Sequence, residues 1–208
     1  TIELLQNAIK NAGGPPNIIT TVKNPTRESG LALFKHPKIA LLMVTGGEAI
    51  VHLAMQSGKK VIAAGPGNPP VIVDETADIK KAAKDIVFGA SFDNNVVCVL
   101  EKEVFVVDTV ADELINEMQR HRAFLLKDAS LIQKVTNLII SKDEGTGYRI
   151  PVVNKKWVGK DAVKILNEIG VSAPSDTKLI IFETVWDHPV VQAEQLTPVL
   201  PIVRVKNW

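Results

Sequence analysis

The sequence predicts an α/β fold built on parallel sheets, because helical periodicity and short β-rich runs alternate along its 208 residues. Residues 38–45 contain a continuous apolar run of strand length, which is typical of a buried parallel strand. Two glycine-rich turns, Gly46-Gly47 and Gly65-Pro66-Gly67, directly follow expected strands. Tight turns of this kind are expected where the strands of a doubly wound sheet end.

Helices and strands alternate through the first 64 residues. Apolar residues at helical spacing indicate a helix over 2–12, and Gly13-Gly14-Pro15-Pro16 ends it. Asn24-Pro25 marks a turn. The remaining expected elements of this part are strands at 18–22, 38–45 and 60–64 and helices at 27–34 and 48–56.

A second α/β unit is expected over residues 65–208, with a boundary near Ala64. Its strongest strand signal is Val104-Phe105-Val106-Val107, a run of β-branched and aromatic residues. Residues 142–156 are polar and irregular, which indicates a surface segment. The other expected elements are strands at 71–73, 178–182 and 200–205 and helices at 78–88, 111–120, 130–140 and 160–169.

Composition narrows the class of protein. A formal net charge of +1 and an aromatic content of 5% argue against a nucleic-acid partner. The longest apolar run, about residues 39–44, is far shorter than the ~20 residues that cross a bilayer, so no membrane partner is expected. One cysteine cannot form an internal disulfide and no signal-peptide pattern opens the chain, so we expect a cytoplasmic protein. Both ends are abrupt, which indicates a segment of a longer protein.

Cys98, the only cysteine, follows a polar, amide-rich turn. An isolated cysteine is more often a buried core residue than a reactive one, because free cysteine is among the most buried residue types. Two glycine-rich turns lie upstream of Cys98, and a carboxylate followed by a proline-bounded strand lies downstream. This setting makes Cys98 a candidate nucleophile. No Gly-x-Ser-x-Gly, His-Glu-x-x-His or Cys-x-x-Cys pattern occurs, so we expect no metal site.

Four segments together resemble one family, although none would do so alone. They are Val44–Glu48, Gly65–Asp74, Ser91–Cys98 and Glu194–Pro201. In this order and approximate spacing they resemble the aldehyde dehydrogenase superfamily, and within it the CoA-acylating enzymes of bacterial ethanolamine and propanediol utilisation. The resemblance covers essentially the whole chain. It implies the last part of a Rossmann-type cofactor domain at residues 1–64 and most of a truncated catalytic domain at residues 65–208.

For Cys98, the resemblance implies a thiolate that adds to an aldehyde, passes a hydride to NAD and is left as a thioester. The Cys98 backbone N–H is the natural donor to the oxyanion. Asn94 and Asn95 either shape the turn through side-chain to backbone bonds or substitute for a second oxyanion donor. His188 lies close in sequence to Glu194, where a site role and a structural role both remain open.

The resemblance also implies the cofactor contacts. Thr45, Gly46, Gly47 and Glu48 stand where a strand ends and a helix begins, and they match residues that contact the pyrophosphate and nicotinamide side. Glu194 matches a glutamate that holds the nicotinamide ribose, since two carboxylate oxygens can each accept a hydrogen bond. In addition, Pro25 lies in a loop that resembles the lining of the adenine pocket.

Ala64 stands where hydrolytic relatives carry the glutamate that activates water. A methyl group cannot act as a general base, so coenzyme A is the expected acyl acceptor and acyl-CoA the expected product. The resemblance further implies a two- to four-carbon aldehyde, a homo-oligomer (dimer or tetramer) and a bacterial microcompartment shell. Two alternatives stay open, a non-catalytic fragment or interaction module and a hydrolytic aldehyde dehydrogenase.

Overall fold

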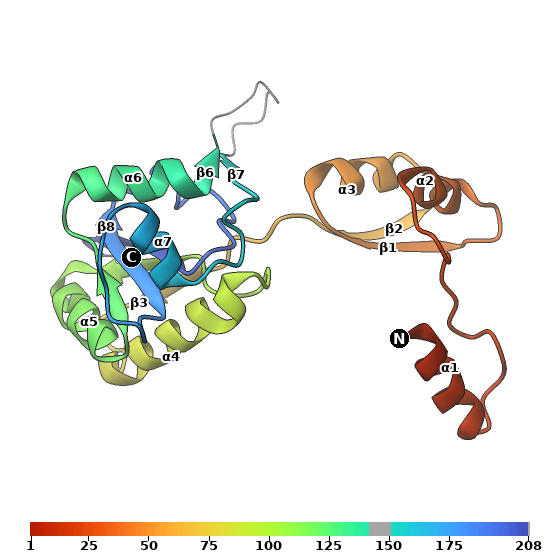
Figure 1. Cartoon of the computed structure of the whole chain (residues 1–208), viewed down its shortest axis with the longest axis horizontal. Coiled ribbons are helices and arrows are strands. Elements are labelled where there is room, and N and C mark those ends of the chain that lie inside the picture. The colour runs from red at the N-terminus through yellow and green to blue at the C-terminus, as the bar shows by residue number, and fades with distance from the viewer. Residues whose placement is uncertain (142–150, 208) are drawn as a thin grey trace. The chain divides into compact units, whose positions relative to one another are not determined.

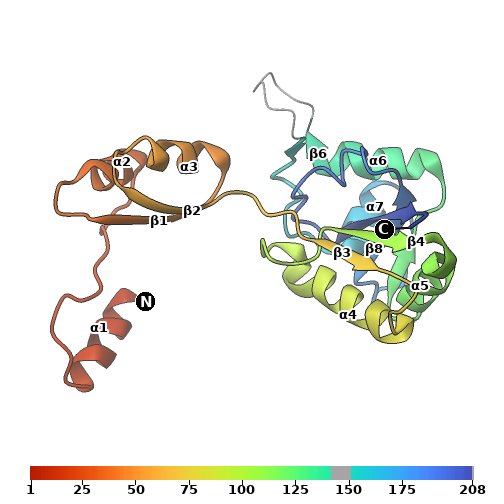
Figure 2. The ribbon, with the colours of Figure 1, turned by 180° about the vertical axis from the view of Figure 1, so that it is seen from behind.

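A computed structural model describes residues 1–141 and 151–207. The chain forms two compact units, Thr1–Gly65 and Pro66–Trp208, shown from opposite sides in Figures 1 and 2. No helix in the described part of the chain is both long enough and apolar enough to span a membrane.

The first unit contains a two-stranded parallel sheet. Strand β1 pairs with β2 from Leu41↔Lys60 to Thr45↔Ala64. A small core of Leu42, Val44 and Ala54 lies on one face of this sheet. The elements in chain order are α1 (Ile2–Asn11), α2 (Arg27–Lys35), β1 (Leu41–Thr45), α3 (Glu48–Met55) and β2 (Lys60–Ala64).

Two expectations for this unit are wrong. Residues 18–22 form no strand, because none of the described residues pairs with them and an isolated strand cannot satisfy its backbone groups. The 38–45 run is shorter than expected, and it is buried on one face only. Met43 is 76% exposed while Leu42 and Val44 are buried. Successive side chains of β1 therefore alternate between exposed and buried, and only one face of the strand is covered.

The second unit contains a five-stranded parallel sheet in the order β3-β4-β9-β8-β5. The expected parallel α/β class is therefore confirmed. Its elements are β3 (Pro70–Val73), α4 (Ile79–Ser91), the 3-10 turn η1 (Phe92–Asn95), β4 (Glu103–Val107), α5 (Asp108–Arg120), β5 (Ala123–Leu125), α6 (Ala129–Ile139), β6 (Ile140–Ser141), β7 (Val152–Val153), α7 (Ala162–Glu168), β8 (Leu179–Thr184) and β9 (Val199–Val205).

Helices cover both faces of this sheet (Figures 1 and 2). Helices α4 and α5 pack on one face around Leu114 and Met118, and α6 and α7 pack on the other around Ile139 and Ile165. All four side chains are fully buried, and burial of each stabilises the fold by roughly 1.5–3 kcal/mol. The sheet is thus packed between two layers of helices.

The sequence did not predict β5, β6 or β7, since two or three residues are too few to show periodicity. Strands β6 and β7 pair antiparallel through Ile140↔Val153 and Ser141↔Val152. Part of the segment expected to be irregular at 142–156 is therefore a strand. Residues 142–150 of that segment lie outside the described residues.

Candidate active site

Three loops meet at the amino-terminal edge of the second sheet. Gly67 and Asn68 precede β3, Cys98 and Lys102 precede β4, and Glu194 precedes β9. Strands β3, β4 and β9 are neighbours and all run parallel, so the loops that enter them converge at one edge. Two predicted site residues, Cys98 and Glu194, therefore come from adjacent loops although they are far apart in the sequence.

The loop before Cys98 contains a left-handed turn. Asp93, Asn94 and Asn95 all have positive φ, at 46°, 51° and 63°. Aspartate and asparagine are the non-glycine residues that tolerate this region best, which explains the Asp-Asn-Asn sequence. Asn95 is buried, and its Nδ2 donates to the carbonyls of Ala90 (2.8 Å) and Glu101 (2.9 Å). Its amide group is thus used to shape the turn.

Asn94 ties the same turn to a neighbouring loop. Its Nδ2 donates to the carbonyl of Gly159 (3.1 Å) and to Oδ1 of Asp161 (2.9 Å). The Gly159 N–H in turn donates to the carbonyl of Leu196, two residues after Glu194, at 3.0 Å. Gly159 thereby links the Cys98 loop to the Glu194 segment.

Lys102 is a candidate site residue that the sequence analysis did not single out. Its side chain is fully buried, and Nζ donates to the carbonyl of Asn95 (3.0 Å), to Oδ1 of Asn95 and to the carbonyl of Val97 (3.1 Å). Burial lowers the pKa of Lys102, while the negative charges of Glu194 and then Cys98 act in the opposite direction. A lysine directly before the strongest apolar strand was the only signal in the sequence.

Gly67 lies against Cys98. A Cβ at position 67 would stand 2.6 Å from the Cys98 carbonyl oxygen and 3.7 Å from the Cys98 Cβ. Only glycine permits this approach of two backbones without displacement. Cys98 itself is a free, partly exposed thiol. It is therefore not the fully buried core thiol that an isolated cysteine would more often be.

The Glu194 segment is anchored through its neighbour. Gln195 is fully buried, and its Nε2 donates to the carbonyls of Lys102 (2.7 Å) and Val199 (2.8 Å). Leu196 has a φ of 50°, which a branched side chain rarely adopts and which the surrounding bonds must hold in place. Glu194 is left half-buried, with its carboxylate near Lys102.

Buried polar atoms gather at this edge of the sheet. Within the described residues, four such atoms have no hydrogen-bond partner: Asn68 Oδ1, Glu103 Oε2, Gln195 Oε1 and Thr197 Oγ1. All belong to the three converging loops or to the first residue of β4. Burial raises the pKa of Glu103 to about 7, and the Lys102 cation opposes this shift. Buried polar groups without a partner, and carboxyl groups with a shifted pKa, are typical of functional sites and rare in purely structural cores.

The first unit carries the other predicted site residues. Thr45 ends β1, Gly46 donates its N–H to the Ala64 carbonyl (3.2 Å), and Gly47 is the N-cap of α3. Glu48 begins the helix and is exposed. The first N–H groups of an α-helix have no partner within the helix, so this turn offers donors to an anion. Pro25 is exposed in the turn before α2.

His188 lies in the connection between β8 and β9 that also carries Glu194. Its Nδ1 accepts from the Val190 N–H (3.3 Å), Nε2 lies 3.5 Å from Thr136 Oγ1 on α6, and its ring packs edge-on against Phe182 at 5.4 Å. Burial lowers its pKa, and Asp187 opposes this. These contacts fix the orientation of the His188 ring.

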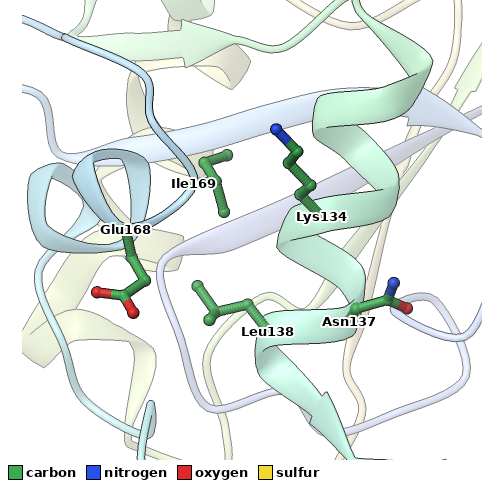
Figure 3. A pocket seen from close by; sticks show the side chains of 5 residues that line it. All are labelled: Lys134, Asn137, Leu138, Glu168 and Ile169. Atoms are coloured by element: carbon green, nitrogen blue, oxygen red, sulfur yellow. The ribbon is translucent and has the colours of Figure 1, made fainter.

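A hollow of about 360 Å³ lies elsewhere, between α6 and α7. Figure 3 shows Leu138 and Ile169 facing each other there, with Lys134 and Glu168 on opposite sides of the hollow. It contains none of the residues that the sequence predicted to be functional.

Comparison with known proteins identifies the family. The model of the aldehyde dehydrogenase family matches residues 1–146. The chain is 50% identical over 208 residues to acetylating acetaldehyde dehydrogenase EutE of Salmonella typhimurium, covering 99% of this chain and 44% of that protein. It is 42% identical to the CoA-propanoylating propanal dehydrogenase of the same organism, covering 100% of this chain and 43% of that one.

Solved structures agree. A propionaldehyde dehydrogenase from the Clostridium phytofermentans fucose utilisation bacterial microcompartment superposes with a TM-score of 0.90 at 42% identity, covering 99% of this chain and 46% of that one. Rhodopseudomonas palustris propionaldehyde dehydrogenase with bound propionyl-CoA gives 0.87 at 44% identity, covering 98% and 44%. The chain belongs to the aldehyde dehydrogenase family, as its motifs predict. It spans less than half the length of the curated relatives it matches.

Proposed function

We propose that this chain supplies the nucleophile and part of the cofactor site of a CoA-acylating aldehyde dehydrogenase. The overall reaction is a short-chain aldehyde plus CoA and NAD+ to acyl-CoA and NADH. The observation that carries the proposal is the position of Cys98, a partly exposed thiol on the loop that lies between the Gly67 and Glu194 loops. A relative from Rhodopseudomonas palustris is described with bound CoA and an acylated cysteine, and Cys98 is the only cysteine here that could correspond to it.

The chemistry begins with addition of the Cys98 thiolate to the aldehyde carbon. The carbonyl oxygen becomes an oxyanion, for which the Cys98 N–H is a donor in reach. Val97 and Val99 flank the thiol and are 36% and 74% exposed, so they offer apolar surface to an alkyl chain of two to four carbons. Acetaldehyde and propionaldehyde fit this description.

Bound NAD+ supplies the hydride acceptor. The residues present fit this group, since the Thr45–Glu48 turn ends with free N–H donors at the start of α3 and Glu194 offers a half-buried carboxylate. We infer that Thr45, Gly46, Gly47 and Glu48 hold the pyrophosphate and nicotinamide side, that Glu194 holds the ribose, and that Pro25 lines the adenine pocket.

The thioester on Cys98 would then pass to CoA. Ala64 ends β2 and carries no group that could activate water. Exchange between a thiol and a thioester needs less activation than hydrolysis, because a thiolate is a strong nucleophile at neutral pH. The names of the acetylating and propanoylating relatives agree with this direction of acyl transfer.

We further propose a homo-oligomer, dimer or tetramer, inside a cytoplasmic bacterial microcompartment. Support for the compartment comes from the Clostridium phytofermentans relative, which is described as coming from a bacterial microcompartment. NAD is the expected cofactor, although an engineered glycolyl-CoA reductase at 44% identity is described with NADP+. Comparing NADH with NADPH formation and measuring the molar mass in solution would test these points.

The decisive experiment measures NADH formation from propionaldehyde by the full-length protein, with and without CoA, beside Cys98→Ala. NADH production that requires CoA and is lost in Cys98→Ala is expected. Equal turnover without CoA would show a hydrolytic enzyme and refute the role given to Ala64. No turnover in either condition would favour a non-catalytic module.

A further inference from the structure

The peptide group between Val97 and Cys98 is held through its carbonyl oxygen. The Val97 carbonyl accepts from Nζ of Lys102 at 3.1 Å and from the Leu100 N–H at 3.2 Å. Both lone pairs of this oxygen are therefore used. Because a peptide bond is planar and trans, the Cys98 N–H of the same unit points in the opposite direction, away from Lys102.

The Cys98 N–H has no acceptor among the described residues, although the N–H groups of Val96, Leu100 and Lys102 in the same loop all donate to carbonyls. It lies on a residue whose side chain is partly exposed. A backbone donor that is oriented but unused is the arrangement that an oxyanion-binding group requires.

Lys102 has no donor left for a substrate. An ammonium group has three N–H bonds, and Lys102 directs them to the Asn95 carbonyl, the Asn95 side chain and the Val97 carbonyl. Those acceptors lie on the turn that precedes Cys98, and Asn95 is itself fixed to Ala90 and Glu101. Bonds from a charged donor are roughly twice as strong as neutral ones, so one side chain can hold the whole turn.

We propose that Lys102 is a positioning residue that aims the Cys98 N–H at the oxyanion formed when Cys98 is acylated. This inference rests on the proposed role of Cys98 as nucleophile. A buried ammonium is costly unless it is fully hydrogen-bonded, and an apolar side chain of similar length would pack here at a lower cost in desolvation. The presence of a lysine at position 102 is therefore explained by the turn that its ammonium group orients.

Two reagents that attack Cys98 differently can test this proposal without NAD or CoA. With p-nitrophenyl acetate, the Cys98 thiolate forms a bond to the ester carbonyl carbon through an oxyanion, and p-nitrophenolate leaves with its electron pair. With iodoacetamide, the thiolate displaces iodide from a methylene carbon and no oxyanion forms. Any change in the fraction of thiolate affects both rates equally, so their ratio reports the oxyanion donor.

The full-length protein would be compared with Lys102→Met and with Lys80→Met, a matched change at an exposed lysine on α4. Rates on Cys98 are obtained by subtracting those of Cys98→Ala. We expect Lys102→Met to lower acylation by about 100-fold, as loss of one oxyanion donor does, and alkylation by less than about threefold. Lys80→Met should leave both rates unchanged.

An equal fall in both rates of Lys102→Met would overturn the orienting role and leave a purely structural one. If Lys102→Met does not fold, as judged by circular dichroism, Lys102→Gln keeps a neutral donor and should show a smaller loss of the same ratio. Absence of Cys98-dependent acylation in the unmodified protein would refute the nucleophile itself. CoA-dependent NADH formation, measured separately, distinguishes that failure from failure of the Lys102 proposal alone.

Discussion

Gln195 and Lys102 are joined by a hydrogen bond of 2.7 Å from the buried side-chain amide of Gln195 to the Lys102 carbonyl. Lys102 in turn holds the turn before Cys98 through its ammonium group. Glu194 is the residue next to Gln195, so the proposed ribose ligand and the proposed nucleophile are anchored to the same lysine. Their geometry is thus maintained by one buried network at the amino edge of the sheet.

Replacing Gln195 by methionine should destabilise this network. Two buried carbonyls, those of Lys102 and Val199, would lose their donor, and we expect a loss on the order of 2 kcal/mol in the free energy of unfolding. Urea unfolding measures it. Gln192→Met is the matched control, because Gln192 is exposed and its side chain makes one bond within the described residues, to the Trp186 carbonyl. Equal losses in the two variants would contradict the importance of the network.

Gly67→Ala should displace Cys98 without removing any reactive group. The new Cβ would stand 2.6 Å from the Cys98 carbonyl oxygen, a distance that real Cβ atoms do not tolerate. We expect turnover to fall by about 10- to 100-fold, since a misplacement of 1 Å at a reacting group costs this much. Gly65→Ala is the control, because nothing lies within 4 Å of a Cβ there. Unchanged turnover in Gly67→Ala would show that the contact does not position the thiol.

Most of the fold could be predicted because long elements carry periodic patterns. The helices α4, α5 and α6 and the strand β4 lie within a few residues of their expected positions. The strand at 18–22 could not be judged from its composition, because a strand depends on a partner that is distant in sequence. Short pairs such as β6 and β7 carry no periodicity at all.

Candidate site residues that belong to chemical motifs could be predicted from the sequence, whereas those defined by packing could not. Cys98 and Glu194 stand out as residue types, and the structure places them on adjacent loops. Lys102 does not, because the sequence cannot show that its side chain folds back onto Asn95 and Val97. The location of the candidate site at the amino-terminal ends of the strands was also unexpected, since open α/β sheets usually bind ligands at the carboxyl ends of their strands.

Glu103 should make folding stability depend on pH. It is 4% exposed, and burial raises its pKa from 4.5 to about 7. Below pH 4.5 the carboxyl is protonated in both the folded and the unfolded chain. As the pH rises, the unfolded chain releases its proton first, so the free energy of unfolding falls until the pH passes about 7.

Glu103→Gln carries no charge at any pH and removes this effect. Relative to the unmodified protein, the variant should become more stable by on the order of 3 kcal/mol between pH 4.5 and pH 8, since one unit of pKa corresponds to about 1.4 kcal/mol. Urea unfolding at pH 5, 6, 7 and 8 gives the difference directly. A difference that stays constant over this range would be inconsistent with a raised pKa.

Glu194→Gln tests the ribose contact separately from the thiol. The amide keeps one oxygen acceptor but loses the charge and the second acceptor, so a bond between a carboxylate and a hydroxyl group is weakened. We expect the KM for NAD+ to rise by about tenfold, while alkylation of Cys98 by iodoacetamide stays within about twofold of the unmodified protein. Steady-state kinetics with varied NAD+ provide the measurement. Glu168→Gln, an exposed change on α7, is the control. If both variants keep the original KM, Glu194 holds no part of the cofactor, and its place beside Lys102 is purely structural.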